Sequence, residues 1–256
     1  MKQISPPDTT INNLVVINGL GGHAYFWDEL GKALQGVRIV VLDLPGHNDT
    51  PPAEDYHYTA LVENIVGRTV GLEPFHLVGW SVGGAVAWLL AASHPHLVRT
   101  LTLVEPAAPH QSPFRLGPTP EPIHAHTYAS LEKVVDAFGS VDPTFSMADA
   151  LQTYKQNPQG RWEPTYDPNI LPALVEDAKA YGEEFYFELE KIMVPTLILR
   201  GERSFIRKEQ IDEIAGALKN VRVRSIVKAG HFLVKERPEA TAELINEFLQ
   251  DVKEPR

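Results

Sequence analysis

The chain has 256 residues, a formal net charge of −10 at pH 7 and no cysteine. A chain of this length can bury a sizeable core, whereas its negative charge argues against nucleic acid or an anionic membrane as the main partner. Without cysteine it has neither a disulfide framework nor a thiolate metal site, and its first residues lack the apolar stretch of a secretion signal. We therefore expect a cytoplasmic protein without a membrane or nucleic-acid partner.

Apolar, β-branched runs alternate with helical segments along most of the chain. The expected strands cover residues 13–18, 37–43, 75–79, 99–104, 195–200 and 221–227. The expected helices cover residues 25–35, 58–70, 84–94, 207–219 and 237–251. Strands that alternate with helices form a parallel sheet that is covered on both faces. The sequence therefore predicts an α/β fold with a mostly parallel sheet of about six strands.

Residues 107–190 interrupt this alternation. They begin with a proline-dense stretch that cannot form a regular element, and amphipathic pieces follow at residues 131–138, 147–155 and 171–190. We interpret residues 107–190 as an inserted helical cap over the carboxyl ends of the strands, where open α/β sheets bind ligands. Residues 1–106 and 191–256 then form the core. Most aromatic side chains of the cap are expected to pack a small core of its own.

The segment at residues 75–84 reads Phe-His-Leu-Val-Gly-Trp-Ser-Val-Gly-Gly. It combines a strand-like apolar run, a Gly-x-Ser-x-Gly turn and the start of a helical stretch, which is the pattern of a nucleophile elbow. In such a turn the side chain of the serine, here Ser81, stands out above the sheet. Gly79 and Gly83 leave room for the strand and the helix to approach each other. The motif alone is common by chance, but its context favours a nucleophilic Ser81.

A serine hydroxyl is a poor nucleophile at neutral pH unless a base takes its proton. His231 is the best-placed base, because it follows the last expected strand and so lies at the same edge of the sheet as Ser81. The other nine histidines are less well placed. Their closely spaced pairs have no further ligand nearby, so we expect no metal site and no cofactor.

Cleavage of an acyl bond also needs two donors for the developing oxyanion. The residue after the nucleophile, Val82, would supply one backbone amide, and Leu20 in the glycine-rich turn at residues 18–22 would supply the other. Such turns also cradle phosphates, but neither Gly-x-Gly-x-x-Gly nor a Gly-Lys-Ser/Thr ending is present, which disfavours a nucleotide site. Gly19 and Trp80, beside these groups, are expected to line the substrate pocket.

Five segments in order resemble the α/β-hydrolase superfamily. They are Asn-Gly-Leu-Gly-Gly at residues 18–22, Val-Leu-Asp-Leu-Pro-Gly-His at 41–47, Gly-Trp-Ser-Val-Gly-Gly at 79–84, Pro-Thr-Leu-Ile-Leu-Arg-Gly at 195–201 and Ala-Gly-His-Phe at 229–232. The resemblance spans nearly the whole chain outside the expected cap. It implies a Ser–acid–His triad, an oxyanion hole and a lid.

The acid departs from the family pattern. In the family it commonly lies three residues after a glycine that corresponds to Gly201, where this chain has Ser204. Because loss of the acid costs roughly 10⁴ in rate in well-studied triads, an active enzyme should take it from another strand end. Glu105 ends the preceding strand and is similar in placement to the acid of certain lactone hydrolases and dehalogenases, while Glu202 is the reserve candidate. Asp43 is more readily explained as a structural carboxylate.

Only about a dozen residues precede the first expected central strand, so the antiparallel hairpin that normally opens this fold should be absent. The strand at residues 37–43 would then lie near an uncovered edge, which proteins usually protect. We hypothesise that the N-terminal residues or a second subunit of a homodimer shield it.

A serine nucleophile with a neutral oxyanion hole attacks carbonyl carbon. The sequence therefore predicts a serine hydrolase that cleaves a carboxylic ester or lactone of a largely apolar small molecule. Hydrolysis of a thioester or of a carbon–carbon bond in a diketone is an alternative, and a non-catalytic ligand-binding member of the fold is another. Epoxide and haloalkane hydrolysis are disfavoured, because those enzymes are expected to carry aspartate in place of Ser81.

Overall fold

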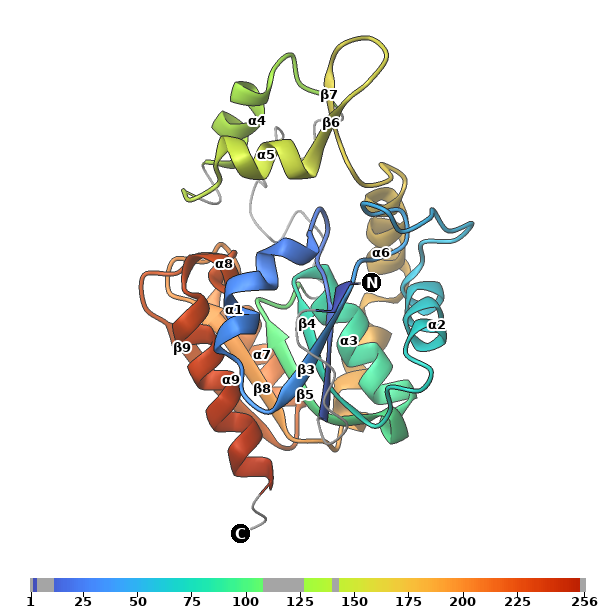
Figure 1. The fold of residues 1–256 in the computed structure, drawn as a ribbon. Coiled ribbons are helices and arrows are strands. Elements are labelled where there is room, and N and C mark those ends of the chain that lie inside the picture. The colour runs from blue at the N-terminus through green and yellow to red at the C-terminus, as the bar shows by residue number, and fades with distance from the viewer. Residues whose placement is uncertain (1, 4–11, 108–126, 140–142, 254–256) are drawn as a thin grey trace.

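A computed structural model of the protein describes residues 2–3, 12–107, 127–139 and 143–253. Its centre is a seven-stranded sheet in the order β1-β3-β2-β4-β5-β8-β9 (Figure 1). The strands are β1 (Lys2–Gln3), β2 (Asn12–Ile17), β3 (Val37–Leu42), β4 (Phe75–Trp80), β5 (Val98–Val104), β8 (Thr196–Gly201) and β9 (Val221–Ile226). In this order, the six strands from β3 to β9 run parallel to one another, which confirms the predicted sheet.

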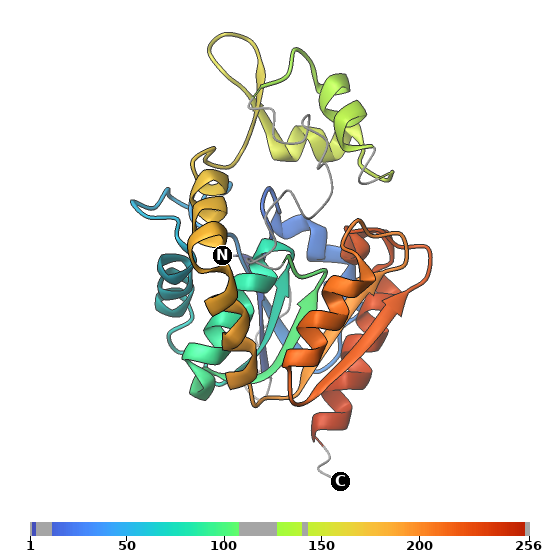
Figure 2. The same ribbon diagram turned by 180° about the vertical axis from the view of Figure 1, so that it is seen from behind.

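Helices cover both faces of this sheet (Figures 1 and 2). One face carries η1 (Ala24–Trp27), α1 (Asp28–Ala33), α8 (Leu233–Glu236) and α9 (Pro238–Lys253), and the other carries α2 (Tyr58–Arg68), α3 (Val82–Ser93), α6 (Ile170–Phe187) and α7 (Lys208–Ala217). Each layer packs its own cluster of buried apolar side chains against the sheet. Every residue of β4 is buried, as expected of a strand in the middle of a covered parallel sheet.

The N-terminal residues protect part of the edge at β3. Lys2 pairs with Val41 and Gln3 pairs with Val40 in an antiparallel register. The sheet therefore gains a short seventh strand that the sequence prediction did not include, and the N-terminal residues shield this edge as one of the two hypotheses proposed. The homodimer alternative stays a prediction.

A small unit lies above the sheet and is called the upper unit here: residues 127–139 and 143–164. It contains α4 (Leu131–Phe138), α5 (Met147–Thr153), β6 (Tyr154–Gln156) and β7 (Trp162–Pro164), and it has its own apolar core (Figure 1). The predicted helices at residues 131–138 and 147–155 are α4 and α5. The β6–β7 hairpin was not predicted, and the proline-dense stretch lies largely outside the described residues.

The following helix, α6, runs down beside α2 and α3 and not above the sheet (Figure 2). Its Ile170 and Leu174 join the buried cluster that covers β2, β4 and β5. The segment at residues 107–190 is therefore not a purely helical layer, and its last helix packs as part of the main body. No helix in the described ranges combines the length and the apolar character that crossing a membrane requires.

Candidate active site

Ser81 lies in a strained turn between β4 and α3. Its φ of 55° and ψ of −122° fall outside the regions that non-glycine residues usually occupy. The Ser81 N–H donates to the Val104 carbonyl at 3.0 Å, and the Ser81 carbonyl accepts from the Gly84 N–H at 2.9 Å. These bonds hold the half-buried serine at the carboxyl end of the central strand, in the strand–turn–helix geometry of the predicted elbow.

Glycines surround this turn where the backbone leaves no space. A Cβ atom on Gly79 would lie 2.6 Å from Cβ of Ala87, and one on Gly83 would clash with two carbonyl oxygens at the end of β2. A Cβ atom on Gly19 would lie 2.9 Å from Cβ of Ser81. The glycine-rich turn after β2 thus lies directly against the serine.

Glu105 and His231 form a buried pair at the carboxyl ends of β5 and β9. His231 Nδ1 lies 3.1 Å from Glu105 Oε2, and the exposed fractions of the two residues are 5% and 0%. Glu105 follows β5, which is the neighbour of β4, and the Ser81 N–H donates to the carbonyl of Val104, the residue before Glu105. A carboxylate on Nδ1 orients the imidazole and leaves Nε2 as the nitrogen that can accept a proton.

Two further donors hold the Glu105 carboxylate. The Gly201 N–H donates to Oε1 at 2.5 Å, and the Ser204 hydroxyl donates to Oε2, the oxygen that faces His231. Ser204 stands where the family commonly has its acid, and here its hydroxyl contacts Glu105, the candidate acid from the neighbouring strand. Glu202, the reserve candidate, is exposed, and its carboxylate accepts the Lys228 N–H at 2.8 Å.

Trp80, which was predicted to line the substrate pocket, is buried in the structure. Its side chain is only 2% exposed, because the indole packs beside the histidine, and its Nε1 donates to the His231 carbonyl at 3.0 Å. The indole and imidazole centroids are 5.5 Å apart. The Phe205 ring also contacts the imidazole, with centroids 4.4 Å apart, and Phe205 is 37% exposed. Trp80 therefore anchors the histidine loop next to Ser81, and Phe205 is an aromatic neighbour that the sequence analysis missed.

Among the described residues, no backbone carbonyl accepts a hydrogen bond from the two amides that were predicted for the oxyanion. The turn after β2 is closed by the Gly22 N–H, which donates to the Gly19 carbonyl at 3.0 Å. Within the described part of the chain, the Leu20 N–H donates to no backbone carbonyl. Val82 is the first residue of α3, so its N–H has no acceptor within the helix.

A buried histidine, His47, holds this turn from behind. The Gly21 N–H donates to His47 Nε2 at 3.1 Å, and His47 Nδ1 lies 3.2 Å from the Pro45 carbonyl. The ring is 1% exposed and stacks on Tyr166 with centroids 5.3 Å apart. Burial lowers the pKa of His47 below its ordinary value of 6.5, which favours the neutral ring that this arrangement needs.

Asp43 has a structural environment. Its carboxylate accepts the Asn18 side-chain amide at 2.6 Å and the Asn48 side-chain amide at 3.1 Å. Asn18 is wholly buried and accepts the Trp27 indole N–H at 2.7 Å. These bonds tie the ends of β2 and β3 together beneath the glycine-rich turn, as expected of a structural carboxylate.

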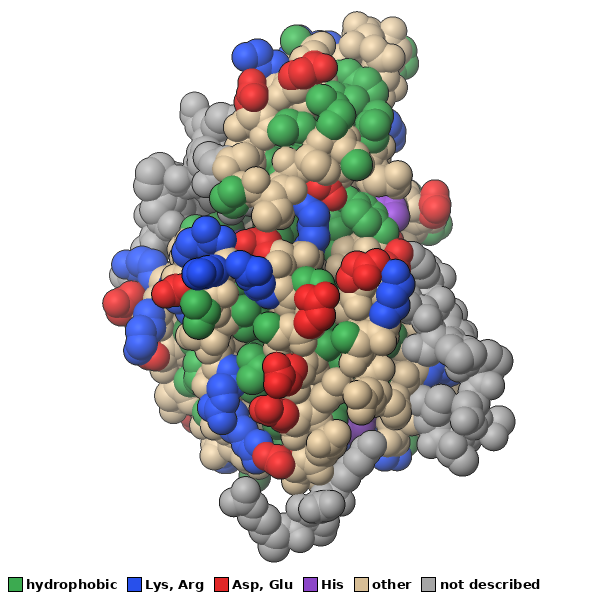
Figure 3. Space-filling view, turned by 60° about the vertical axis from the view of Figure 1, so that its left-hand side comes forward, with side chains coloured by type: hydrophobic (Ala, Val, Ile, Leu, Met, Phe, Trp, Pro, Cys, Tyr) green, Lys and Arg blue, Asp and Glu red, His purple; other side chains and the backbone are tan. Residues whose placement is uncertain are grey.

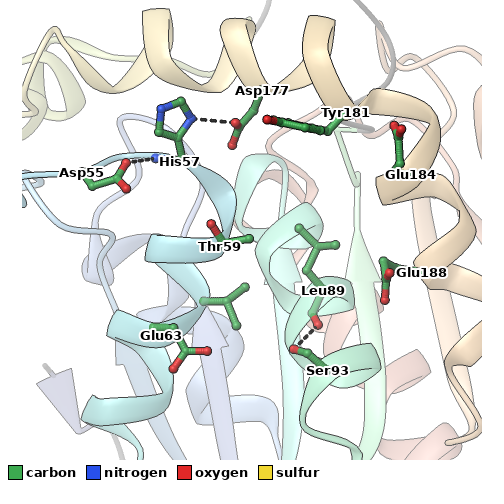
Figure 4. A pocket seen from close by; sticks show the side chains of 11 residues that line it. Asp55, His57, Thr59, Glu63, Leu89, Ser93, Asp177, Tyr181, Glu184 and Glu188 are labelled. Atoms are coloured by element: carbon green, nitrogen blue, oxygen red, sulfur yellow. Dashed lines mark hydrogen bonds and ion pairs between the residues drawn. The ribbon is translucent and has the colours of Figure 1, made fainter.

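A cavity of about 630 Å³ lies elsewhere, between α2, α3 and α6 (Figure 4). Its lining includes neither Ser81 nor the Glu105–His231 pair. His57 Nδ1 lies 2.6 Å from Asp177 Oδ1 at its upper rim, and the hydrogen bond that His57 donates to this carboxylate raises the pKa of His57. This pair joins the loop before α2 to α6.

One face of the molecule shows both signs of charge over the main body (Figure 3). Hydrophobic side chains gather on the part of that face that the upper unit forms. On α5, for example, Leu151 is 57% exposed.

The chain combines a parallel sheet with a serine at positive φ and a buried Glu–His pair, and these features point to one class of protein, the α/β hydrolases. The sequence profile described as "alpha/beta hydrolase fold" matches residues 12–238. The chain belongs to this family, as its five motifs predicted.

Particular relatives are named as lipases and esterases. Monoacylglycerol lipase abhd6-B of Xenopus laevis is 28% identical over 267 residues, which cover 94% of this chain and 76% of the relative. A pimeloyl-[acyl-carrier protein] methyl ester esterase of Neisseria meningitidis is 29% identical over 258 residues. The match covers 97% of this chain and 97% of that relative. The crystal structure of an alpha/beta hydrolase from Novosphingobium aromaticivorans matches the fold with a TM-score of 0.73, 22% identity and coverage of 94% of this chain and 91% of that one.

Proposed function

We propose that the protein is a serine hydrolase that cleaves a carboxylic ester or lactone of a largely apolar small molecule through an acyl-enzyme. The observation that carries this proposal is the buried Glu105–His231 pair, with 3.1 Å between Oε2 and Nδ1, beside the positive-φ turn of Ser81. The relatives that are named as lipases and methyl ester esterases add support, because their names specify ester bonds.

In the proposed reaction His231 Nε2 takes the hydroxyl proton while Ser81 Oγ forms a bond to the substrate carbonyl carbon. The carbonyl electron pair moves onto oxygen, where the N–H groups of Leu20 and Val82 stabilise the charge. When the pair returns, the bond to the leaving oxygen breaks, and His231 gives that oxygen its proton. Glu105 stabilises the imidazolium. Water then repeats these steps on the acyl-enzyme and releases the carboxylic acid.

We also propose that residues 107–190 act as a cap over this site. Supporting contacts tie the segment to loops at the carboxyl ends of the strands. The Asn48 N–H donates to the Thr165 carbonyl at 3.0 Å, and the Asp167 N–H donates to the Gly46 carbonyl at 2.8 Å. The partly exposed ring of Phe205 beside the imidazole favours an apolar acyl or alcohol group.

Covalent labelling tests the nucleophile directly. A fluorophosphonate probe should react rapidly with the native protein, with the label on the peptide that contains Ser81, and Ser81→Ala should abolish both labelling and turnover of a nitrophenyl ester. Ser225→Ala, on an exposed position of β9, is the matched control. A native protein that is not labelled would support a ligand-binding role instead.

A substrate panel separates the remaining alternatives. Esters, lactones, thioesters and a diketone are compared by kcat/KM with the same enzyme. Fast cleavage of an ester or lactone supports the proposal. Fast cleavage of the diketone with slow cleavage of esters would assign carbon–carbon hydrolysis, and a preference for thioesters would assign a thioesterase.

A further inference from the structure

A carboxylate of the upper unit contacts the main body near the candidate active site. Asp149 of α5 is 4% exposed. Its Oδ1 accepts the hydroxyl of Tyr25 at 2.6 Å, and its Oδ2 accepts the ammonium group of Lys235 at 2.7 Å. These three residues are called the Asp149 clasp below.

The two main-body partners of Asp149 lie in segments that follow the glycine-rich turn and the histidine loop of the proposed active site. Tyr25 belongs to η1, three residues after the glycine-rich turn that ends at Gly22. Lys235 belongs to α8, four residues after His231. One side chain of the upper unit thus joins the segment after the oxyanion turn to the segment after the base.

Packed aromatic rings continue the connection toward the reacting groups. The Phe26 ring lies 6.0 Å from the Trp80 ring and 6.0 Å from the Phe232 ring, edge to face in both cases. The Lys235 ammonium lies 5.9 Å from the centre of the Phe26 ring. Trp80 and Phe232 adjoin Ser81 and His231 in the chain, so these rings connect the clasp with the two residues that are proposed to react.

The contacts of the clasp stabilise the charged form of the Asp149 carboxylate although the residue is buried. Burial by itself raises the pKa of Asp149, but the hydrogen bonds from Lys235, Tyr25 and Ser146 outweigh it and leave the pKa below its ordinary value of 3.8. A buried carboxylate that loses its cationic partner is costly to the folded state. The docked arrangement is therefore strongly preferred over one in which Asp149 is buried alone.

We propose that Asp149 is a positioning residue, which holds the oxyanion turn and the histidine loop in their reactive arrangement when the upper unit is docked on the main body. This inference rests on the proposed hydrolase function. It predicts that the clasp affects the chemical step for every substrate. A contact that merely docks a cap would instead affect the binding of large substrates.

Lys235→Met and Tyr25→Phe test the clasp better than a change of Asp149 itself. Asp149 also accepts the backbone N–H and the hydroxyl of Ser146 at 2.7 Å each, so its replacement would weaken the start of α5 as well. Lys208→Met is the matched control, because Lys208 forms a 2.6 Å pair with Asp212 on the exposed surface of α7.

The first measurement is kcat and KM for nitrophenyl acetate and nitrophenyl octanoate, with thermal unfolding midpoints to verify the fold. Lys235→Met and Tyr25→Phe should each lower kcat for both esters about tenfold, since small misplacements of catalytic groups have effects of this size or larger. The double variant should be little worse than the poorer single variant, because both act through one carboxylate. Unchanged kcat with a raised KM for the octanoate alone, or behaviour equal to that of Lys208→Met, would overturn the proposal.

The second measurement needs no activity. Hydrogen–deuterium exchange, read by mass spectrometry, should show faster exchange at residues 19–25 and 229–235 in Lys235→Met than in the native protein, with no such change in Lys208→Met. Unchanged exchange in both segments contradicts the clasp even if the substrate is unknown. Failure of the proposed function is seen separately, as absent fluorophosphonate labelling of the native protein.

Discussion

The hydroxyl of Ser204 donates a hydrogen bond to Oε2 of Glu105, the same oxygen that lies 3.1 Å from His231 Nδ1. Ser204 therefore contacts the proposed acid from the position where related proteins commonly carry theirs. The Gly201 N–H on the other oxygen completes the set of donors. The carboxylate is wholly buried, so these partners replace the water that would otherwise solvate it.

Glu105→Gln should lower kcat about 10⁴-fold, because an amide cannot stabilise the imidazolium or hold the histidine in the required tautomer. The measurement is the initial rate with a nitrophenyl ester across pH 6–9. Glu202→Gln is the matched control, since Glu202 contacts the Lys228 N–H and is exposed. Near-normal activity of Glu105→Gln together with an inactive Glu202→Gln would transfer the acid role to Glu202.

Ser204→Ala should lower kcat/KM about five- to tenfold with little change in KM. The substitution removes one hydrogen bond to a buried carboxylate that keeps its contacts with His231 and the Gly201 N–H. Steady-state kinetics with a nitrophenyl ester measure the effect. Activity equal to that of the native protein would mean that the hydroxyl does not hold the acid.

Gly19→Ala should greatly reduce the rate of fluorophosphonate labelling. The new methyl group would lie 2.9 Å from Cβ of Ser81 and 3.0 Å from the Trp80 carbonyl oxygen, so the turn that bears the Leu20 amide must move away from the serine. Gly67→Ala is the control, because nothing lies within 4 Å of its new methyl group on α2. That variant should keep its labelling rate and gain about 0.5–1 kcal/mol of stability.

In His47→Gln, the free energy of unfolding should fall less than in the native protein as the pH is lowered. Burial lowers the folded-state pKa of His47 below 6.5. The contribution of the neutral ring to stability is therefore fully present above pH 6.5. It is lost as the pH falls toward the lowered pKa, because the unfolded chain then binds more protons than the folded chain. Urea unfolding between pH 5 and 8 gives the free energy of unfolding for both proteins. A parallel pH dependence in the native protein and His47→Gln would contradict this assignment.

Local sequence was sufficient for most of the framework. The strands and helices around the sheet lie within a few residues of their predicted bounds, because alternating apolar runs and turn residues specify each element nearly independently of the rest. The Gly79-Trp-Ser81-Val-Gly83 turn was readable for the same reason. Glu105 became a candidate acid only through the family resemblance and the serine at position 204.

The upper unit was predicted less well. The hairpin β6–β7 turns through Asn157-Pro-Gln-Gly160, where the Asn157 side chain accepts two backbone N–H groups and Gly160 has a φ of 76°. These residues are typical of a turn, but the amphipathic, helix-like pattern of the neighbouring segments led to the hairpin being missed. A tryptophan beside a nucleophile gives no indication of which face of the sheet its ring covers, so only the structure showed that Trp80 packs against His231.

The sequence by itself determined the sheet and the turn at Ser81, and it pointed to His231 as the candidate base, since each depends on a short contiguous pattern. Only the tertiary structure decided which partners surround them. The Ser204–Glu105 bond, the His47 support of the oxyanion turn and the Asp149 clasp join residues that are 99, 26 and up to 124 positions apart. Such pairs form when strand ends and loops converge at one edge of the folded sheet, and no local propensity encodes that convergence.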